Sequence, residues 1–579
     1  KTLIDLAKKV EGTVRHASVH AAGLVISPTE MTNYTPLQRE SNGDKIISQY
    51  DMFSISDDYE GVGLIKLDLL GIRNLSILGH ATQIVKQNRG ITVDLDSIPV
   101  DDQKAFELLA KGETMGLFQL EGSGMTRYLV ELKPTSIFDI MVMVALYRPG
   151  PMNIIEDYIA RKHNPNKITY YDPRMKEYLQ NSLGLLVYQD DVLYTAINIA
   201  GYDWEEADKF RKAMGKKIPA EMAKQRDHFI EGCIVNGLTK EKAEGLYQLI
   251  KPFEGYGFNK AHAASYGRVA YQTAYMKANF PAIYMSSVLT ADSGDVEKIA
   301  EIIAECKRMH IPILPPDINE SFSQFTVIKD EENKLSSARI RFGLITIKNF
   351  GQGIATAIIE ERKKGGKFVS LVNFLDRVKD KNLNKKSLEA LIKAGALDSF
   401  GIDRGILLGN IEKLLEYNKE QEKQSIDQSS LFGLMSDTSS LPTLKLDDVP
   451  VIDQKEKLAW EKELLGLYIS GHPLDRYREI ISKRDMDIKK AKNTLKDGEI
   501  ATLACIIEDI KSISTKNGDS MAFLRVADFS DTIEAVVFPR VLLEFRTAFT
   551  PDRCIAIKGK MSDRNGKKSI IVERVKALA

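Results

Sequence analysis

The spacing of apolar residues changes along this chain, and the change limits the folds that the chain can adopt. Over residues 76–300 the apolar positions follow a helical period, interrupted by glycine and proline, which predicts a large α-rich domain. From about residue 497 apolar and polar residues alternate, and Lys516–Asp519 and Arg564–Gly566 are turn sequences typical of hairpins. Five short strands in about 80 residues favour an OB barrel. The candidate strands are residues 499–514, 521–527, 532–538, 553–560 and 567–574.

The length of the chain predicts several domains. With 579 residues it is too long for one hydrophobic core, and about three to five domains are expected. Near the N-terminus, Gly23–Ser27 and Val62–Asp68 are rich in apolar residues and predict buried strands. Residues 418–460 are rich in Gln, Ser, Lys and Asp and predict a linker, which one short apolar cluster, Leu431–Phe432, interrupts.

Charge and cysteine content narrow the possible functions. The 80 basic residues balance the 80 acidic ones, so any nucleic-acid-binding surface must be local. The cysteines form no CxxC pair, so we expect neither a zinc site nor a disulfide framework, and a reducing cytoplasmic compartment. The sequence contains no long apolar run and no signal peptide, so no membrane partner is expected. Lys1 lies within a helical pattern, which predicts that the natural protein begins upstream. The four cysteines are Cys233, Cys306, Cys505 and Cys554.

One segment does carry a local excess of positive charge. Residues 341–396 contain 12 lysines and arginines against five acidic residues. Two glycine-bearing hairpins occur there, Ile347–Gly353 and Ile392–Ala396, each beside an amphipathic helical pattern. Glycine lets the backbone N–H groups at the start of a helix approach a phosphate without reading base sequence. The segment therefore predicts a non-specific DNA-binding module.

Eight stretches, in order, resemble the C-family DNA polymerases, the family of the alpha (catalytic) subunits of bacterial DNA polymerase III. Each stretch alone is a weak signal, but together they extend over nearly the whole chain. They are Val19–Ile26, Lys66–Gly71, Gly116–Glu121, Ala145–Pro151, Arg211–Lys217, Gly255–His262, Leu314–Asn319 and Gly471–Leu474.

The resemblance implies a multidomain α+β fold. Its parts are the end of a nucleotidyltransferase-like (polymerase beta-like) palm, large helical fingers, a tandem helix-hairpin-helix module and a C-terminal OB barrel. The family's PHP domain, its first palm segment with a Pro-Asp-x-Asp-x-Asp motif and its C-terminal tail have no counterpart in this sequence. The domains expected are residues 1–75 (end of thumb and C-terminal palm segment), 76–320 (fingers), 321–400 (tandem helix-hairpin-helix), 401–495 (linker with a clamp-binding motif) and 496–579 (OB fold).

The resemblance to these polymerases makes Asp68 a candidate ligand of a catalytic metal ion. Templated nucleotide addition uses two Mg²⁺ ions, which need carboxylate ligands from palm strands. By the resemblance, Asp68 is one metal-binding and catalytic carboxylate, although a surface aspartate before a turn is the alternative. Lys66 lies two residues earlier, on the same strand face, where it could meet phosphate charge or form a salt bridge.

Other acidic and histidine pairs are weaker candidates for a metal site. Asp94–Asp96 is expected in a connector between helices and Asp485–Asp487 in a charged linker, so neither pair replaces the two missing palm aspartates. We therefore expect this chain to be inactive as a polymerase by itself. His16 and His20 have the spacing of a helical zinc pair, but the apolar stretch that follows predicts a strand and argues against metal binding.

The fingers of this family grip the triphosphate, and the resemblance assigns nucleotide or phosphate contacts to two regions. Arg148 precedes Pro-Gly-Pro, which constrains the backbone, and a guanidinium can bind phosphate oxygens bidentately. Tyr256 and Phe258 either stack on a base or pack in the core, and the sequence leaves both open. Ser265 and Tyr266 follow close behind. The expected nucleotide or phosphate ligands are Arg148, Arg211, Lys216, Lys217, Lys260 and His262, with Lys212 in the same cluster and a solvated charged face as the alternative.

The remaining expected sites bind DNA and protein. In the two hairpins the candidate DNA contacts are Lys348, Gly351, Gly353, Lys393 and Gly395. Gln428–Phe432 resembles the short motif that docks polymerases into the sliding clamp (beta), with Gln428, Leu431 and Phe432 as contacts. The OB barrel could bind single-stranded template through basic and aromatic residues. These are Lys558, Lys560, Arg564, Lys567 and Lys568, with Phe523 and Phe529.

The function that the resemblance implies is replicative DNA-directed DNA polymerase. The expected partners are primed DNA, deoxynucleoside triphosphates, the sliding clamp and other polymerase III holoenzyme subunits, with Mg²⁺ as cofactor. Two alternatives stay open. The chain could be a non-catalytic clamp- and DNA-binding module, or it could come from an accessory lesion-bypass polymerase of the same family.

Overall fold

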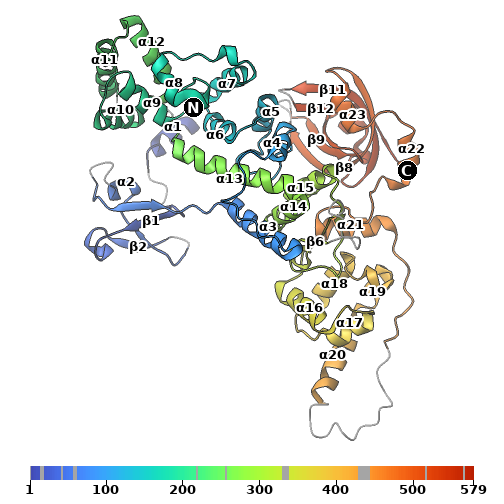
Figure 1. Cartoon of the computed structure of the whole chain (residues 1–579). Coiled ribbons are helices and arrows are strands. Elements are labelled where there is room, and N and C mark those ends of the chain that lie inside the picture. The colour runs from blue at the N-terminus through green and yellow to red at the C-terminus, as the bar shows by residue number, and fades with distance from the viewer. Residues whose placement is uncertain are drawn as a thin grey trace. The chain divides into compact units, whose positions relative to one another are not determined.

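The chain divides after Ser76 into two compact units, residues 1–76 and 77–579. The structure is a computed structural model, and Figure 1 shows its helices and strands. It describes residues 2–13, 18–40, 43–56, 61–216, 219–254, 257–328, 338–427, 444–514, 518–564 and 567–578.

The first unit contains two small antiparallel sheets. Strand β1 pairs with β4 so that Gly23 lies opposite Asp68, and β2 pairs with β3. Both predicted strands near the N-terminus form, but the expectation that they are buried is wrong: Leu24, Ile26 and Ile65 are exposed. A two-stranded sheet leaves its apolar side chains open unless another layer covers them. The elements are α1 (Thr2–Val10), β1 (Gly23–Ile26), β2 (Leu37–Arg39), β3 (Ile46–Ser48), α2 (Met52–Ile55) and β4 (Ile65–Asp68).

Residues 73–308 form the predicted helical domain. The helices are α3 (Arg73–Arg89), α4 (Gln103–Ala110), α5 (Ser123–Leu132), α6 (Ile137–Leu146), α7 (Ile154–His163), α8 (Lys176–Leu179), α9 (Gln189–Asn198), α10 (Trp204–Lys216), α11 (Pro219–Val235), α12 (Lys240–Ile250), α13 (Lys260–Asn279), α14 (Pro281–Ala291) and α15 (Val296–Arg308).

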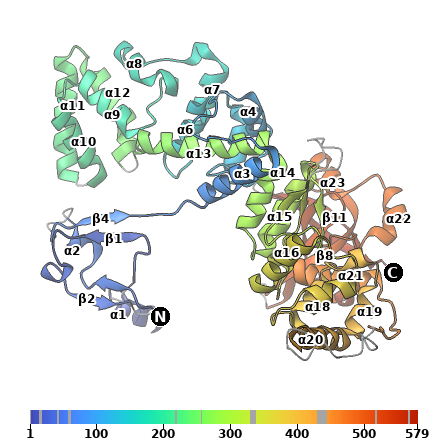
Figure 2. The same ribbon diagram turned by 60° about the horizontal axis from the view of Figure 1, so that its bottom comes forward.

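The long helix α13 organises this domain. It runs beside α6 and α4, as both views show (Figure 1, Figure 2). Helix α6 is apolar on nearly every side, so eight of its ten residues are buried, and Ser136 and Asp139 close its N-terminus with a capping box. On α13, the fully buried Lys277 donates to the carbonyl oxygens of Glu113 and Met115 and pairs with Glu305 of α15 at 2.6 Å. This buried ion pair joins α13 to α15 and to the loop after α4.

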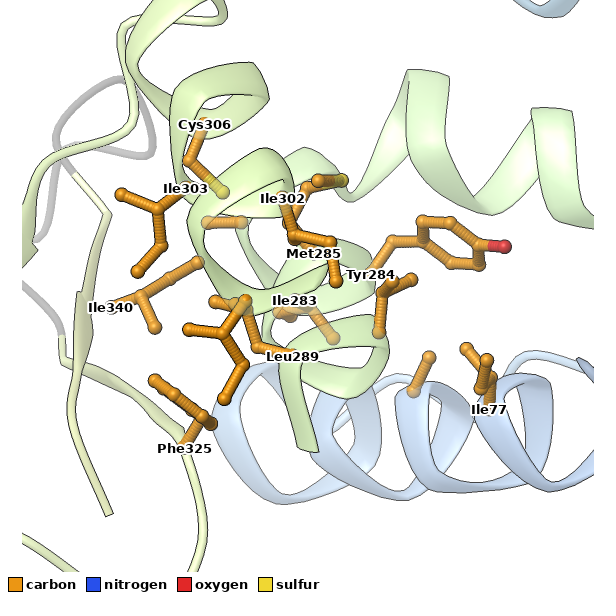
Figure 3. Packing of buried hydrophobic residues seen from close by; sticks show 14 of the residues in the cluster. Ile77, Ile283, Tyr284, Met285, Leu289, Ile302, Ile303, Cys306, Phe325 and Ile340 are labelled. Carbon is orange, nitrogen blue, oxygen red and sulfur yellow. The ribbon is translucent and has the colours of Figure 1, made fainter. Parts of the chain in front are cut away.

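Two separate hydrophobic cores support the domain. One lies among α8–α12 and includes Phe210, Phe229 and Tyr247. The other contains α3, α6, α13, α14 and α15 and continues into a small sheet. Figure 3 shows Leu289 of α14 packed toward Phe325 and Ile340 of that region, with Met285 near Ile302 in the same cluster. The sheet consists of β5 (Ile313–Leu314), β6 (Thr326–Ile328) and β7 (Arg339–Arg341).

The basic segment forms a cluster of short helices. A hairpin containing Asn349 in the left-handed region (φ 68°) leads into α16 at Gln352. The second predicted hairpin, residues 392–396, lies beside α18, at the C-terminal end of that helix. Gly395 (φ 78°) follows the C-terminus of α18, and the N–H of Ala396 donates to Leu391 in a helix-ending turn. The second connection between helices is residues 378–384, between α17 and α18. The helices are α16 (Gln352–Gly365), α17 (Leu371–Arg377), α18 (Lys385–Lys393) and α19 (Arg404–Gly409).

The predicted linker is more ordered than its composition indicates. Helix α20 (Ile411–Asp427) enters the segment and α21 (Gln454–Leu465) leaves it, since both carry enough apolar residues to pack on the core. Asn418 donates to Leu375 and Val378, and the backbone N–H of Asp447 donates to Asn410. The chain is thus held to the same helical core on both sides of residues 428–443.

A buried ion pair reinforces this anchoring. Arg404 of α19 lies 3.1 Å from Glu461 of α21, and both side chains are almost fully buried. The other oxygen of Glu461 accepts the backbone N–H groups of Ile469 and Ser470. Two further helices follow, α22 (Arg478–Ser482) and α23 (Ile488–Thr494).

The C-terminal residues form the predicted barrel. Its five strands close in the order β10-β12-β11-β8-β9, with β10 parallel to β12 and the other pairs antiparallel. Alternate residues point inward, as in β9, where Ala522, Leu524 and Val526 are buried. The elements are β8 (Ile500–Ser514), β9 (Ser520–Ala527), β10 (Thr532–Val537), α24 (Pro539–Glu544), β11 (Cys554–Arg564) and β12 (Lys567–Ala577). In the described part of the chain, no helix is long and apolar enough to cross a bilayer.

Candidate functional site

Asp68 lies at the end of β4 with two basic side chains around it. Lys66, on the same strand face, forms a salt bridge with Asp68 Oδ1, and His20 Nδ1 lies 3.5 Å from the same oxygen. His20 reaches Asp68 because β1 and β4 pair at Gly23, where a Cβ would come within 3.0 Å of the imidazole. No local sequence pattern connects His20 with Asp68, since only the strand pairing brings them together.

The electrostatics keep Asp68 ionised. The hydrogen bond from Lys66 holds the pKa of Asp68 below its usual range, against an opposing effect of burial. Asp68 is about half exposed, and both basic contacts are made by Oδ1. An ionised carboxylate with an accessible oxygen fits one ligand of a Mg²⁺ ion.

A complete metal site needs more ligands than these. Within the described ranges no group of three or more His, Cys, Asp or Glu side chains is close enough to hold a metal ion. Asp94 and Asp96 lie in a turn between α3 and α4, as predicted, whereas Asp487 caps α23. His16 lies outside the described residues.

A second group of candidates comes together at the start of α13. The guanidinium of Arg148 lies over the ring of Phe258, 3.9 Å from its centroid. His262 packs edge-on against the same ring, and Tyr266 lies beside His262. Burial and the nearby Arg148 lower the pKa of His262, which favours a neutral imidazole. Lys260 Nζ lies 5.7 Å from the centroid of Tyr188. The structure therefore brings Arg148, Lys260 and His262 into one neighbourhood.

The segment 187–191 belongs to this neighbourhood and was missed in the sequence analysis. The backbone N–H of Gln189 donates to Phe258, and that of Lys260 donates to Asp190 Oδ2. Asp191 is buried; its Oδ2 accepts the N–H groups of Val187 and Tyr188 at 2.9 Å. Its Oδ1 has no hydrogen-bond partner among the residues that the structure describes. Only the apolar Leu-Leu-Val before this Tyr-Gln-Asp-Asp stretch hinted at a buried turn.

Asp191 makes the start of α9 sensitive to pH. Burial raises the pKa of Asp191 from 3.8 to about 6. Because the folded value exceeds the unfolded one, the stabilising contribution is complete below about pH 4 and is lost as the pH rises through about 6, by up to about 3 kcal/mol. We expect hydrogen exchange at the start of α9 to show reduced protection at pH 7 relative to pH 5, after correction for intrinsic rates. Asp191→Asn should lack that pH dependence; an equal dependence in both proteins would contradict the assignment.

The basic cluster on α10 is arranged differently. Arg211 and Lys212 both bind Asp208 of the same helix, at 2.7 Å and 3.0 Å. Hydrogen bonds from Arg211 and Lys212 hold the pKa of Asp208 below its usual range. Lys216 ends α10, while Lys217 and Tyr256 lie outside the described residues. No contact joins this cluster to Arg148 within the part of the chain that the structure describes.

The DNA-binding candidates divide into two groups. Lys348, Gly351 and Gly353 are exposed at the start of α16, whose N-terminus has no side-chain cap. A Cβ at Gly353 would come within 3.1 Å of the Asn382 amide, so the two connections between helices meet there. Lys393, by contrast, is paired with Glu389 at 2.6 Å.

Gly395 also lacks the surroundings expected of a DNA contact. A Cβ at Gly395 would come within 2.2 Å of the Arg404 guanidinium. This glycine is therefore needed for packing and for its positive φ, and it does not open a path for phosphate.

The remaining candidates are the clamp-motif residues and the basic and aromatic residues of the barrel. Gln428, Leu431 and Phe432 lie outside the described residues. On the barrel, Lys558 is exposed opposite Arg574, Lys560 pairs with Glu573, and Lys568 donates to the carbonyl oxygen of Leu495. Phe523 is half-buried. The exposed Phe529 packs against His472 and under Arg478.

Four successive segments of the chain match models of known protein families. Residues 1–71 match the bacterial DNA polymerase III alpha NTPase domain and residues 74–237 the finger domain of the same subunit. Residues 310–407 match a helix-hairpin-helix motif and residues 501–578 an OB-fold nucleic acid binding domain.

Curated relatives extend over nearly the whole chain, and each is named DNA polymerase III subunit alpha. The Thermus aquaticus protein is 41% identical over 93% of this chain and 43% of its own length. The Pseudomonas aeruginosa protein is 37% identical over 99% of the chain and 50% of its own length, and the Escherichia coli K12 protein 36% over 97% and 49%. The chain thus spans about half the length of the curated relatives it matches.

Helical fingers, a helix-hairpin-helix segment and a five-stranded OB barrel define a multidomain α+β protein with two modules of nucleic-acid-binding type. The predicted fold class is confirmed in these three parts. The chain belongs to the family of bacterial DNA polymerase III alpha subunits.

Proposed function

We propose that this chain carries the fingers, the DNA-binding modules and one active-site carboxylate of a replicative DNA-directed DNA polymerase. The activity is addition of deoxynucleotides to a primer 3′-OH by phosphoryl transfer. The observation that carries the proposal is continuous similarity, over 93% to 99% of the chain, to relatives named as this subunit. The expected division into domains at residues 75, 320, 400 and 495 is part of the proposal.

The described residues supply distinct parts of the chemistry. Asp68 holds one of two Mg²⁺ ions, which in the complete enzyme neutralise charge on the transferred phosphate. Lys66 keeps that carboxylate ionised and close to the strand. Arg148 and Lys260 bind triphosphate oxygens, and His262 stays neutral beside them. Arg211 and Lys212 contact phosphate by exchanging Asp208 for a nucleic-acid or nucleotide anion. Lys216 and Lys217 add positive charge to the same cluster.

Duplex DNA binds at the start of α16. The exposed, uncapped N–H groups near Gly351 and Gly353 face a backbone phosphate, and Lys348 adds positive charge. Asn382 extends the same surface from the second connection. Lys393 and Gly395, whose surroundings are occupied, are not part of this contact.

Substitution of Lys348 tests this surface. We expect Lys348→Ala to weaken binding of a primed duplex several-fold and to lower the slope of log affinity against log salt by about one, because one phosphate contact is lost. Fluorescence anisotropy across a salt series measures both quantities. Lys393→Ala is the matched control and should leave the slope unchanged. The reverse pattern would move the DNA contact to the end of α18.

Two partner assignments extend the proposal. Gln428, Leu431 and Phe432 dock the protein into the sliding clamp, and the exposed Lys558 with its neighbours Lys560, Arg564, Lys567 and Lys568 guides single-stranded template along the barrel. Other holoenzyme subunits bind the same protein in the cytoplasm. Lys568 and Lys560 have internal partners, so Lys558 is the strongest candidate on the barrel.

Primer extension with Mg²⁺ and four deoxynucleotides tests the function. The protein that the full gene encodes should extend a primed template, and chelation of the metal should stop it. This chain by itself should bind the template without extending it. If the full gene product binds primed DNA and clamp but adds no nucleotide, the non-catalytic module becomes the correct assignment. Extension mainly past damaged template bases would favour the lesion-bypass role.

A further inference from the structure

The surroundings of Arg148 differ from those of several other buried or half-buried arginines of this chain. Arg161 and Arg404 have carboxylate partners, and the buried Arg362 lies over the ring of Phe322 and donates to the carbonyl oxygen of Ile318. For Arg148, no carboxylate lies within ion-pair distance in the ranges that the structure describes, and its ordered contact is the face of Phe258 at 3.9 Å. A half-buried guanidinium without a counter-ion is ready to accept an anion from outside the protein.

Phe258 is itself held on several sides. The ring is only 8% exposed and belongs to the main core. Its carbonyl oxygen accepts the N–H of Gln189 at 2.9 Å, and its backbone pairs with Tyr188. The edge contact with His262 fixes the ring from α13. This burial excludes stacking of Phe258 on a base, one of the two roles that the sequence left open.

The backbone at Arg148 does not by itself fix the orientation of the guanidinium. Its N–H bonds back to Leu146 in a tight turn after α6, and Gly150 follows with φ 111°. The turn sets where the side chain starts, but four side-chain torsions remain free. A flat aromatic face removes much of that freedom, since a stacked guanidinium lies parallel to the ring with its N–H groups pointing outward.

We propose that Phe258 is a positioning residue for nucleotide binding: its ring holds the Arg148 guanidinium in the plane from which it binds the triphosphate of the incoming nucleotide. The inference rests on the proposed polymerase function and adds a specific residue to it. Phe258 acts through Arg148 and does not touch the substrate. Its loss should therefore weaken nucleotide binding more than the chemical step.

Steady-state kinetics of the full gene product test the proposal. Phe258→Leu keeps an apolar side chain but removes the π face. A cation–π contact of about 0.5–2 kcal/mol corresponds to about 2- to 30-fold in affinity, so we expect KM for deoxynucleotides to rise by that factor. The maximal rate should stay within about threefold, and affinity for primed DNA should not change. Phe258→Tyr, which keeps the ring, should restore the wild-type KM.

A double-mutant cycle separates positioning from a general structural role. In an Arg148→Lys background, Phe258→Leu should add less than about twofold to KM, because there is no guanidinium left to position. An equal effect of Phe258→Leu in both backgrounds, or an unchanged KM in the wild-type background, would overturn the proposal. If Phe258→Leu does not fold, Phe258→Met, which keeps the volume, replaces it in the same cycle.

A binding measurement distinguishes failure of this inference from failure of the proposed function. Calorimetric titration of the chain with dATP and Mg²⁺ needs no catalysis. Weaker dATP binding by Phe258→Leu, restored by Phe258→Tyr, would support the role of Phe258 even if the full gene product extended no primer. Equal dATP binding by all three proteins would refute it, whatever the result of primer extension.

Discussion

Asp68→Asn in the protein that the full gene encodes is expected to reduce primer extension by about a thousandfold or more. The substitution keeps the shape of the side chain but removes the charge that binds Mg²⁺, and several kcal/mol of transition-state stabilisation corresponds to that factor. Single-turnover extension of a labelled primer measures it. Binding of primed DNA should remain, because the helix-hairpin-helix segment and the barrel are unchanged.

Asp44→Asn provides the matched control in the same unit. Asp44 is fully exposed and its only described ion-pair partner is Arg39, at 3.4 Å, so its loss should not affect extension. Retention of a tenth or more of the activity by Asp68→Asn would show that Asp68 is not a metal ligand. A loss for Asp44→Asn as large as for Asp68→Asn would mean that the charge of the whole unit matters and not the carboxylate at the end of β4.

Lys277→Ala is expected to destabilise the helical domain by about 3–5 kcal/mol. The ammonium is completely buried, and its removal leaves two carbonyl oxygens without their donor and leaves Glu305 with Arg308 as its remaining ion-pair partner. Burial lowers the pKa of Lys277, but Glu305 and the two carbonyl groups keep the charged form satisfied. Native-state hydrogen exchange of α13 and α15 measures the local free energy of unfolding.

Lys298→Ala on α15 is the control for that experiment. Lys298 is more than half exposed and lies 3.8 Å from Asp292, so we expect a change within about 0.5 kcal/mol. Equal protection of α13 in Lys277→Ala and Lys298→Ala would contradict a structural role for the buried ion pair. The comparison separates the loss of a buried donor from the loss of a lysine in general.

Local patterns in the sequence predict much of the fold. Alternation along residues 499–574 predicts all five barrel strands within a few residues, because side chains of a strand point alternately inward and outward. The helical period predicts the fingers because apolar residues three and four positions apart lie on one face of a helix. The predicted hairpin at Ile392–Ala396 overlaps the end of α18, because a glycine in the left-handed region also ends a helix. The linker interpretation missed α21 because Leu458, Leu464 and Leu465 are too few to change the average composition.

The candidate site was less predictable, because its residues are distant in sequence. Arg148, Tyr188 and Phe258 have no common local pattern, and only tertiary packing of α6, α9 and α13 brings them together. His20 reaches Asp68 through the register of two short strands. Sequence motifs identify Arg148 and Asp68 as candidates, but they do not show what holds each side chain in place.

The contacts on both sides of residues 428–443 fix the spacing of the two segments that flank this stretch. Asn418 donates to the carbonyl oxygens of Leu375 and Val378, and the backbone N–H of Asp447 donates to Asn410. The distance between the two flanks is therefore set by the packing of one helical core and not by the residues that connect them in sequence.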